Sequence, residues 1–390
     1  MKAKVRFSAG KIGGKSGKQS NLDGVRASML NEYRQDHRHP WVVAYSGGKD
    51  STLLLQLVFE LLVDIPQKKQ RRDIHVVAND TLVESPLVIE HLKKSLRSIQ
   101  EGARGKNLPV SVTITRPYVD QTFWVNVIGR GYIPPTRSFR WCTDRMKISP
   151  ANRFIKRLVQ THERAVLLVG TRKSESANRR RNIERREKEN GRLNPHNQIK
   201  SCDIFTPIAD LSDDEVWMEL MSSTPPWGGT HQELITLYRN ALGGECPVVL
   251  SKEDAPSCGT TSPRFGCWTC TVVQKDRSLE GLIESGFDAF EPLLKFRDRL
   301  QKLRENNNNR MKVRRDGSTK YRNGNRVYGP FKLKVRRKIL NELQQLEAQT
   351  GRKLISREEI TIIHDVWDRD GALYETRDGL LKMLGVTEAV

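Results

Sequence analysis

Apolar runs and helix-spaced segments alternate along the first half of the chain. Short apolar runs predict strands at 41–45, 74–78, 110–115 and 165–170, and apolar residues at helical spacing predict helices at 52–63, 86–100 and 150–162. Strands that alternate with helices indicate a parallel, doubly wound α/β sheet, whose ligands bind beyond the carboxyl ends of its strands. We expect a fold of this class.

The second half of the chain loses this alternation and divides into further parts. Helices are expected at 211–221, 333–346 and 357–367, with a Pro- and Gly-rich stretch at 225–229 and a mobile loop at the asparagine run 306–309. The expected division is a basic N-terminal arm at 1–40, an α/β nucleotide-binding domain at 41–225, a cysteine-bearing region at 226–295 and a basic, helical C-terminal region at 296–390.

A serine- and glycine-rich turn joins the first expected strand to the first expected helix. It reads Ser46-Gly47-Gly48-Lys49-Asp50-Ser51. Backbone N–H groups and the helix N-terminus there can face an anion, the glycines allow a phosphate to approach closely, and the lysine and hydroxyls can bind it. The spacing is not that of a Walker A loop, G-x-x-x-x-G-K-[ST]. A plain helix entry is the alternative for an isolated match.

This turn resembles the SGGxDS signature of the PP-loop ATP pyrophosphatases. Three further segments resemble the phosphoadenosine phosphosulfate (PAPS) reductase branch of that superfamily. They are 138–143 followed by Lys147, 170–176, and 207–208 followed by 213–217. The resemblance covers about residues 40 to 220 and implies that ATP is split between its α- and β-phosphates.

The resemblance also implies roles for individual residues. The ATP-binding set would be Ser46, Gly47, Gly48, Lys49, Asp50, Ser51, Asp80 and Gly170. Within it, Asp50 would help to place Mg²⁺, while Ser46, Gly48, Lys49 and Ser51 would hold the β- and γ-phosphates. Asp80 would contact the nucleoside or the metal, with a helix cap as the alternative. Arg172 would bind the α-phosphate or the acceptor anion, with a surface arginine as the alternative. Lys49, Asp50 and Arg172 are the expected catalytic residues.

The six cysteines are ligands, redox groups or core thiols, because a cytosolic chain of this size is not expected to form a disulfide framework. Cys258, Cys267 and Cys270 are spaced C-x₈-C-x₂-C, which brings three thiolates together on a tight loop. A fourth thiolate can come from Cys142. Four thiolates bind zinc or an iron–sulfur cluster, and the spacing does not separate the two.

The cysteine set resembles that of the DNA phosphorothioation sulfurtransferases of the Dnd and Ssp systems, which join a PP-loop domain to such cysteines. The segment 329–333 resembles an element of their C-terminal part, so this resemblance covers nearly the whole chain after residue 40. It implies a [4Fe-4S] cluster on Cys142, Cys258, Cys267 and Cys270, with structural Zn²⁺ as the alternative. Cys246 is the alternative fourth ligand, and Cys202 is expected to be a semi-buried thiol.

Positive charge is large and clustered. The formal net charge is +21, and residues 297–338 carry sixteen Lys/Arg against three acids, while residues 172–200 carry ten against four. Clustering on this scale favours a polyanion partner over a solvated surface, and nucleic acid is the natural candidate. The residues expected to contact DNA are Arg179, Arg180, Arg181, Arg314, Arg315, Arg336 and Arg337.

The resemblance to the phosphorothioation sulfurtransferases implies an ATP pyrophosphatase that activates a DNA backbone phosphate, by adenylation, for replacement of a nonbridging oxygen by sulfur in a phosphorothioate modification and defence system. A cysteine desulfurase is the expected sulfur donor, and other subunits of the system are expected partners.

Three alternatives belong to other classes of protein. A PAPS or adenylylsulfate reductase is disfavoured because the sequence ends without the E-C-G-x-H tail of that family, and a tRNA thiolation enzyme is disfavoured by the reductase-like segment 170–176. A catalytically silent nucleic-acid-binding subunit is disfavoured by the intact phosphate loop.

No stretch of the sequence approaches the roughly 20 apolar residues that a membrane span requires. The basic N-terminus also lacks the apolar core of a secretory signal. We therefore expect a cytoplasmic protein without a membrane partner.

Overall fold

A computed structural model describes residues 21–175, 177–242 and 265–370. Its centre is a six-stranded sheet in the order β3-β2-β1-β4-β6-β5. The strands are β1 (Trp41–Ala44), β2 (Ile74–Asn79), β3 (Val110–Thr115), β4 (Ala165–Leu168), β5 (Leu193–Pro195) and β6 (Cys202–Phe205). All neighbouring pairs are parallel except β5 and β6. The doubly wound α/β sheet predicted from the alternation is confirmed.

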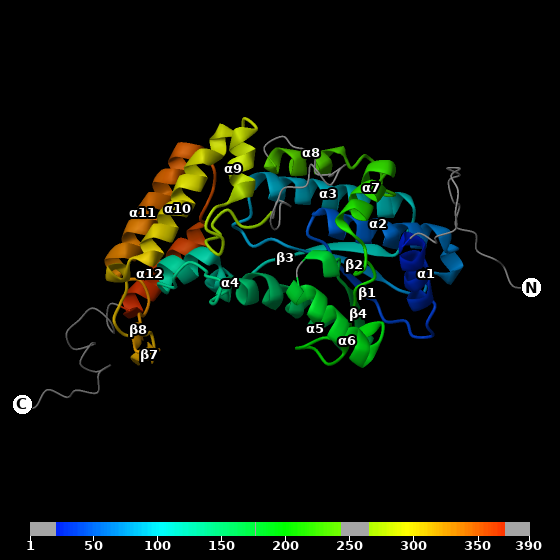
Figure 1. The fold of residues 1–390 in the computed structure, drawn as a ribbon, viewed down its shortest axis with the longest axis horizontal. Coiled ribbons are helices and arrows are strands. Elements are labelled where there is room, and N and C mark those ends of the chain that lie inside the picture. Colours follow the sequence, from blue (N-terminus) through cyan, green and yellow to red (C-terminus); the bar gives the residue numbers. More distant parts are fainter. Residues whose placement is uncertain (1–20, 176, 243–264, 371–390) are drawn as a thin grey trace, which may run out of the picture.

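Helices cover both faces of this sheet (Figure 1). On one face lie α1 (Asn21–Tyr33), α2 (Lys49–Asp64), α3 (Pro86–Gly105), α7 (Asp213–Ser222) and α8 (Gln232–Ala241), and on the other lie α5 (Ser149–His162) and α6 (Ala177–Asn190). Nearly every residue of α2 is buried, from Leu53 to Leu62 in the main apolar core. This burial explains why an almost continuous apolar run forms a helix here, because the helix is covered on both sides.

A second apolar core lies beside the sheet and draws on two distant parts of the chain. It contains α9 (Arg277–Glu284), α10 (Glu291–Glu305), α11 (Leu333–Thr350) and α12 (Arg357–Asp370), together with a short π-helical segment, Val125–Gly129, and the one-turn helix α4 (Trp141–Thr143). The Trp124 indole donates to the carbonyl of Leu354, and that of Trp367 donates to the carbonyl of Ile128. Residues 123–146 therefore pack with the C-terminal helices, across the domain limits expected from the sequence.

The asparagine run is ordered, which corrects the expectation of a mobile loop. Asn307–Asn309 form a 3₁₀ turn, and the Asn306 side chain accepts from the backbone N–H of Asn308. Asparagine side chains cap such turns well, so the run stops α10 rather than loosening the chain. Beyond it, β7 (Lys320–Arg322) and β8 (Asn325–Val327) form an exposed hairpin.

Within the three described ranges, no helix is both long enough and apolar enough to cross a membrane.

Candidate functional site

The serine- and glycine-rich turn at residues 46–51, called the phosphate loop here, lies at the carboxyl end of β1. It is next to β4, where the strand order reverses direction. Gly47 has φ +75°, a conformation that favours glycine. The Ser51 hydroxyl donates to the carbonyl of Gly48 and lies 3.1 Å from the Ser46 hydroxyl, which closes the loop. No side chain caps the N-terminus of α2 at Gly48. The first turn of a long helix thus presents backbone N–H groups at the switch point of the sheet, the geometry that binds anions.

Two cations and two carboxylates form one ion-pair network beneath this loop. The Nζ of Lys49 lies 3.3 Å from the Oδ2 of Asp50 and 3.2 Å from the Oδ1 of Asp213. The Nε of Arg172 lies 2.6 Å from the Oδ1 of Asp50, and its Nη2 contacts Asp213. Lys49 and Arg172 are both buried. The network holds Lys49 against the start of α2 and brings together the three residues expected to be catalytic.

Arg172 is placed differently from its expected role as a direct anion ligand. Its guanidinium also donates to the Ser174 hydroxyl and to the carbonyl of Leu211, and only 1% of the residue is exposed. Burial opposes the positive charge, but Asp50 and Asp213 outweigh it and raise the pKa of Arg172. The structure therefore corrects the expectation: Arg172 positions two carboxylates, and its donors are directed at protein groups.

Asp213 and Tyr238 belong to the site but were not assigned to it from sequence. Asp213 begins α7, whose N-terminus is fixed by a reciprocal capping box between Ser212 and Glu215. Tyr238, on α8, receives a hydrogen bond from the backbone N–H of Lys49, and its ring lies 5.7 Å from the Lys49 Nζ. The motif 213–217 was a usable signal for Asp213. Nothing near Tyr238 in the sequence marks it, because its partner is 189 residues away.

Gly170 allows β4 to approach the phosphate loop closely. A Cβ atom at this position would lie 3.0 Å from the carbonyl oxygen and 3.1 Å from the carbonyl carbon of Asp50. Both are backbone atoms in the first turn of α2, so they cannot move aside as a flexible side chain would. The glycine thus shapes the loop rather than touching a ligand through a side chain.

We expect Gly170→Ala to displace this first turn and to lower both ATP turnover and stability. Overpacking of this kind costs about 1–3 kcal/mol. The free energy of unfolding, from denaturant titration, and pyrophosphate release will measure the two effects. Gly105→Ala is the matched control, since a Cβ there meets no atom within 4 Å. Equal behaviour of the two variants would contradict the close-approach role.

Asp80 lies at the carboxyl end of β2, as expected, but its carboxylate is already engaged. The Oδ1 accepts from the backbone N–H of Leu82, and the Oδ2 lies 3.0 Å from the Nε of Arg116. Asp80 is buried. These contacts give it the structural role of fixing the turn after β2 and holding Arg116 at the end of β3.

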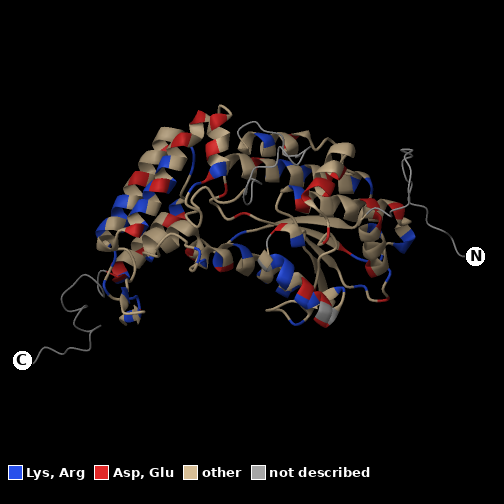
Figure 2. Ribbon diagram, in the orientation of Figure 1, with Lys and Arg blue, Asp and Glu red and all other residues tan. Residues whose placement is uncertain are grey.

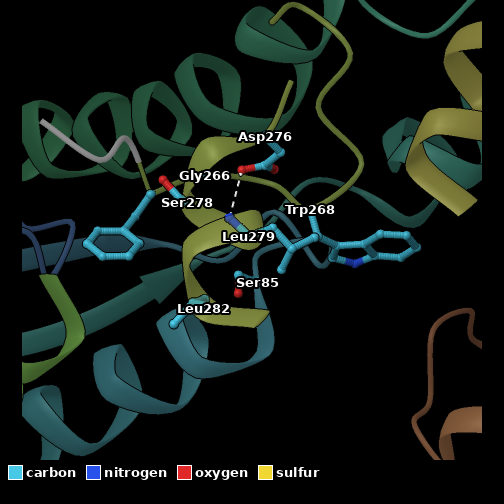
Figure 3. A pocket seen from close by; sticks show the side chains of 8 residues that line it. Ser85, Gly266, Trp268, Asp276, Ser278, Leu279 and Leu282 are labelled. Atoms are coloured by element: carbon cyan, nitrogen blue, oxygen red, sulfur yellow. Dashed lines mark hydrogen bonds between the residues drawn. The ribbon is translucent and has the colours of Figure 1, made fainter. Parts of the chain in front are cut away.

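The cysteine-bearing segment is fastened to the same edge of the sheet. Cys267 forms an antiparallel β-bridge with Glu84. Two backbone hydrogen bonds extend this bridge: the N–H of Ser85 donates to the carbonyl of Gly266, and the N–H of Trp268 donates to the carbonyl of Val83. Figure 3 shows Gly266 and Trp268 beside Ser85 and the start of α9, where the Asp276 carboxylate caps the helix by accepting from Leu279. Residues of the segment and of α9 together line a small pocket at this junction.

Three of the predicted cysteine ligands belong to the segments that meet there: Cys142 and Cys267 pack against the second core, and the backbone N–H of Cys270 donates to the carbonyl of Cys267. Burial raises the pKa of the Cys142 thiol, and a thiolate at Cys270 raises it further. Burial and Glu84 raise the pKa of Cys267, with Cys270 again adding to the effect, and the Thr81 hydroxyl lies 3.3 Å from the Cys267 sulfur. Cys258 and Cys246 lie outside the described residues.

The described cysteines of this set do not form a metal site by themselves. Within the described part of the chain, no group of three or more His, Cys, Asp or Glu side chains is arranged to hold a metal ion. Cys202 is buried in β6, away from these thiols, and burial raises its pKa to about 12. That placement agrees with the expectation of a plain core thiol, although it is buried rather than semi-buried.

The arginines expected to contact DNA fall into two groups. Arg179, Arg180 and Arg181 are exposed on α6, although Arg179 pairs with Glu175. Arg314 and Arg337 are exposed near and on α11.

Two of the expected DNA-contacting arginines point inward instead. Arg336 is 3% exposed and donates to the carbonyl of Gly129 and to Asp370. Arg315 forms two hydrogen bonds with the same carboxylate, at 2.9 Å each. Asp370 thus ties Arg315 and Arg336 to the second core. This corrects the sequence expectation for both residues, because an arginine committed to a buried carboxylate is not presented to a polyanion.

Comparison with known proteins gives a family match and more distant likenesses. The model of the phosphoadenosine phosphosulfate reductase domain matches residues 40–273. An uncharacterized protein of Methanocaldococcus jannaschii is 28% identical over 197 residues, which cover 50% of this chain and 34% of that protein. The chain therefore spans about a third of that relative's length.

Two solved structures are similar at low identity. The PAPS reductase of Candida auris, in a phosphate complex, is 11% identical over 54% of this chain and 89% of its own, with a TM-score of 0.32. The U34-tRNA thiolase of Methanococcus maripaludis with its [4Fe-4S] cluster is 14% identical over 73% of this chain and 80% of its own, with a TM-score of 0.35. At these scores neither carries a functional argument.

The family match covers well over half of the chain and includes the phosphate loop, the Gly170 turn and the segments with Cys142 and Cys267. The chain belongs to the phosphoadenosine phosphosulfate reductase domain family of PP-loop proteins.

Proposed function

We propose that the protein cleaves ATP to AMP and pyrophosphate and uses the AMP to activate a DNA backbone phosphate, so that sulfur replaces a nonbridging oxygen. One observation carries the proposal. The phosphate loop follows β1, the cysteine segment is bridged to the residues after the neighbouring strand β2, and both lie at the carboxyl edge of one sheet. Adenylation and thiol chemistry can therefore act on one bound phosphate.

The residues of the loop fit the first step. ATP binds with its β- and γ-phosphates on the loop, facing the N–H groups at the start of α2. Lys49 neutralises the charge that develops on departing pyrophosphate. Asp50 and Asp213 are the carboxylates that would hold Mg²⁺, which supplies further charge neutralisation when bound. Arg172 keeps both carboxylates in place.

The DNA phosphate is adenylated first, and the exchange of oxygen for sulfur follows. A nonbridging oxygen of DNA attacks the α-phosphorus of ATP and forms a phosphate–AMP linkage while pyrophosphate leaves. A persulfide supplied by a cysteine desulfurase then attacks the DNA phosphorus, and AMP leaves with that oxygen. A dithiol reductant cleaves the remaining S–S bond and releases the phosphorothioate. The activation is necessary because an unmodified phosphodiester oxygen is a poor leaving group.

The cysteines are suited to an iron–sulfur cluster by their chemistry. Cys142, Cys267 and Cys270 would supply soft sulfur donors, and Cys258 would supply the fourth. The raised pKa values of Cys142 and Cys267 keep these two thiols neutral until a metal displaces the protons. A bound cluster would supply a site for sulfur or electrons next to the phosphate loop. Zn²⁺ is the alternative occupant.

The test is a reconstituted reaction under anaerobic conditions. Protein, Mg²⁺, labelled ATP, a cysteine desulfurase, cysteine, a dithiol and either DNA or tRNA are combined, and the nucleotide products are separated by chromatography. Sulfur in DNA is detected as a nuclease-resistant dinucleotide after digestion. We expect AMP and pyrophosphate, with sulfur in DNA.

Other products would reject the proposal in distinct ways. ADP and orthophosphate as main products would exclude a pyrophosphatase. Sulfur found only in tRNA would indicate a tRNA thiolase, and reduction of PAPS to sulfite would indicate a reductase of sulfur assimilation.

A further inference from the structure

A second basic surface lies on the side of the sheet covered by α5. We call it the α4–α5 strip. It comprises Arg116, Arg137, Arg140, Lys147, Arg153, Lys156 and Arg157. Figure 2 shows basic residues concentrated along α5. The sequence hides this surface, because its members are spread over more than forty positions and lie outside both charge-dense blocks.

Most cations of the strip are available for a partner. Arg137, Arg140, Lys156 and Arg157 are exposed, and none of these four forms an ion pair with any residue that the structure describes. On α5, Lys156 and Arg157 lie on the same side as Arg153, since residues three and four apart share a helix face. By contrast, Arg315 and Arg336 of the C-terminal basic block are bound to Asp370. Dense charge in the sequence therefore does not ensure that each of its arginines can receive a polyanion.

Exposed aromatic rings accompany these cations. Tyr118 is 60% exposed and Phe139 is 45% exposed. The guanidinium of Arg153 lies 3.8 Å from the centre of the Tyr118 ring, and Phe139 sits in the sequence between Arg137 and Arg140. Large exposed rings next to unpaired cations are the combination that binds single strands, with bases stacked on the rings and phosphates on the cations. A duplex keeps its base faces inside the stack and gains only the charge contacts.

Hydrogen bonds and ion pairs connect the strip to the candidate site. The Arg153 guanidinium donates to the carbonyl of Arg116, directly after β3, and Arg116 pairs with Asp80 after β2. The Asn79 side chain at the end of β2 donates to the carbonyl of Lys147, and the Nζ of Lys147 lies 3.6 Å from Glu84, the bridge partner of Cys267. A nucleic-acid strand lying on the strip would thus lead to the carboxyl edge of the sheet, which carries the cysteine segment and the phosphate loop.

We propose that the α4–α5 strip binds single-stranded DNA and guides its backbone to the sheet edge. The single-stranded character follows from the aromatic and cationic surface, while the choice of DNA rests on the proposed function. The strip delivers the phosphate that is to be modified, whereas the exposed arginines of α6 add general attraction.

The experiment measures binding by fluorescence anisotropy at several salt concentrations. The probes are a labelled single-stranded DNA, the matched duplex and an RNA of the same sequence. The test variant is Lys156→Glu/Arg157→Glu, and the matched control is Lys68→Glu/Lys69→Glu, which makes the same charge change at another exposed pair. Circular dichroism and thermal melting confirm that each variant folds.

We expect the strip variant to bind single-stranded DNA at least about tenfold more weakly than the control, and its log-log salt slope to be shallower by about 0.7 for each lost phosphate contact. Tyr118→Ala and Phe139→Ala should each weaken single-strand binding roughly tenfold and leave the salt slope unchanged, because stacking releases no counterions.

Equal losses of affinity for single-stranded DNA in the test and control variants would contradict the proposed role of the strip. Unchanged affinity in both aromatic variants would also contradict it. Tighter binding of the duplex or of RNA would overturn the single-stranded DNA assignment. Binding through the strip without any sulfur transfer in the reconstituted reaction would instead overturn the proposed function and leave the strip standing.

Discussion

Replacing Lys49 by methionine is expected to lower the rate of AMP and pyrophosphate formation by a factor on the order of 10² or more. The Nζ of Lys49 lies between Asp50 and Asp213 at the first turn of α2, where charge would develop on departing pyrophosphate in the proposed reaction. Methionine fills most of the same buried space but carries no charge. The loss should therefore fall on turnover, and the variant should still fold.

The measurement is pyrophosphate release at saturating ATP, with unfolding in denaturant as the check on folding. Lys68→Met is the control, because this substitution removes the same charge at an exposed position in a short 3₁₀ turn away from the loop. Lys49→Arg adds a second comparison, since it keeps the charge on a bulkier head group. Near-normal turnover in Lys49→Met would remove Lys49 from the catalytic set.

We expect the parent protein, when purified without oxygen, to show an iron–sulfur absorption band, and we expect Cys267→Ser to abolish that band. Cys267 is held in the bridge to Glu84 and is close to Cys270, so its loss removes a central thiol of the set. A serine hydroxyl is a poor ligand for such a cluster, because thiolates are the ligands that hold it. Sulfur transfer to DNA should be lost together with the band.

The control is Cys202→Ser, which makes the same chemical change in the core of β6. Cys202 is fully buried, and its sulfur contacts the backbone carbonyl of Asp203, so the band should survive. Iron and zinc contents of anaerobic protein complete the measurement. Stoichiometric zinc without iron would indicate a structural zinc site instead of a cluster. A band retained in Cys267→Ser would show that this cysteine is not a cluster ligand.

The phosphate loop shows how far local sequence carries a prediction. The apolar run 41–45, the two glycines and the leucine-rich segment after them predict strand, turn and helix, and the structure has β1, the loop and α2 in that order. Each of these preferences depends on a few neighbouring residues, which is why a reading of the sequence finds them. By contrast, α6 escaped prediction because it is polar on all sides and shows no apolar stripe.

The basic C-terminal block shows where such reading fails. Leu333, Arg336 and Leu340 lie on one buried side of α11, so Arg336 stands in the apolar stripe rather than opposite it. Its helical spacing was a visible signal that the residue faces inward. Its partner Asp370 was not visible, because the pairing depends on how α12 packs against the segment Val125–Gly129.

The sequence by itself determined the class of fold and the strand, turn and helix that form the phosphate loop, because helix, strand and turn preferences act over a few residues. Tertiary structure alone decided which carboxylates hold Lys49, that the Tyr238 hydroxyl accepts from the backbone N–H of Lys49, that the cysteine segment joins the edge after β2 and which arginines face solvent. These features depend on contacts between residues far apart in the chain, and burial, not spacing along the sequence, selects them.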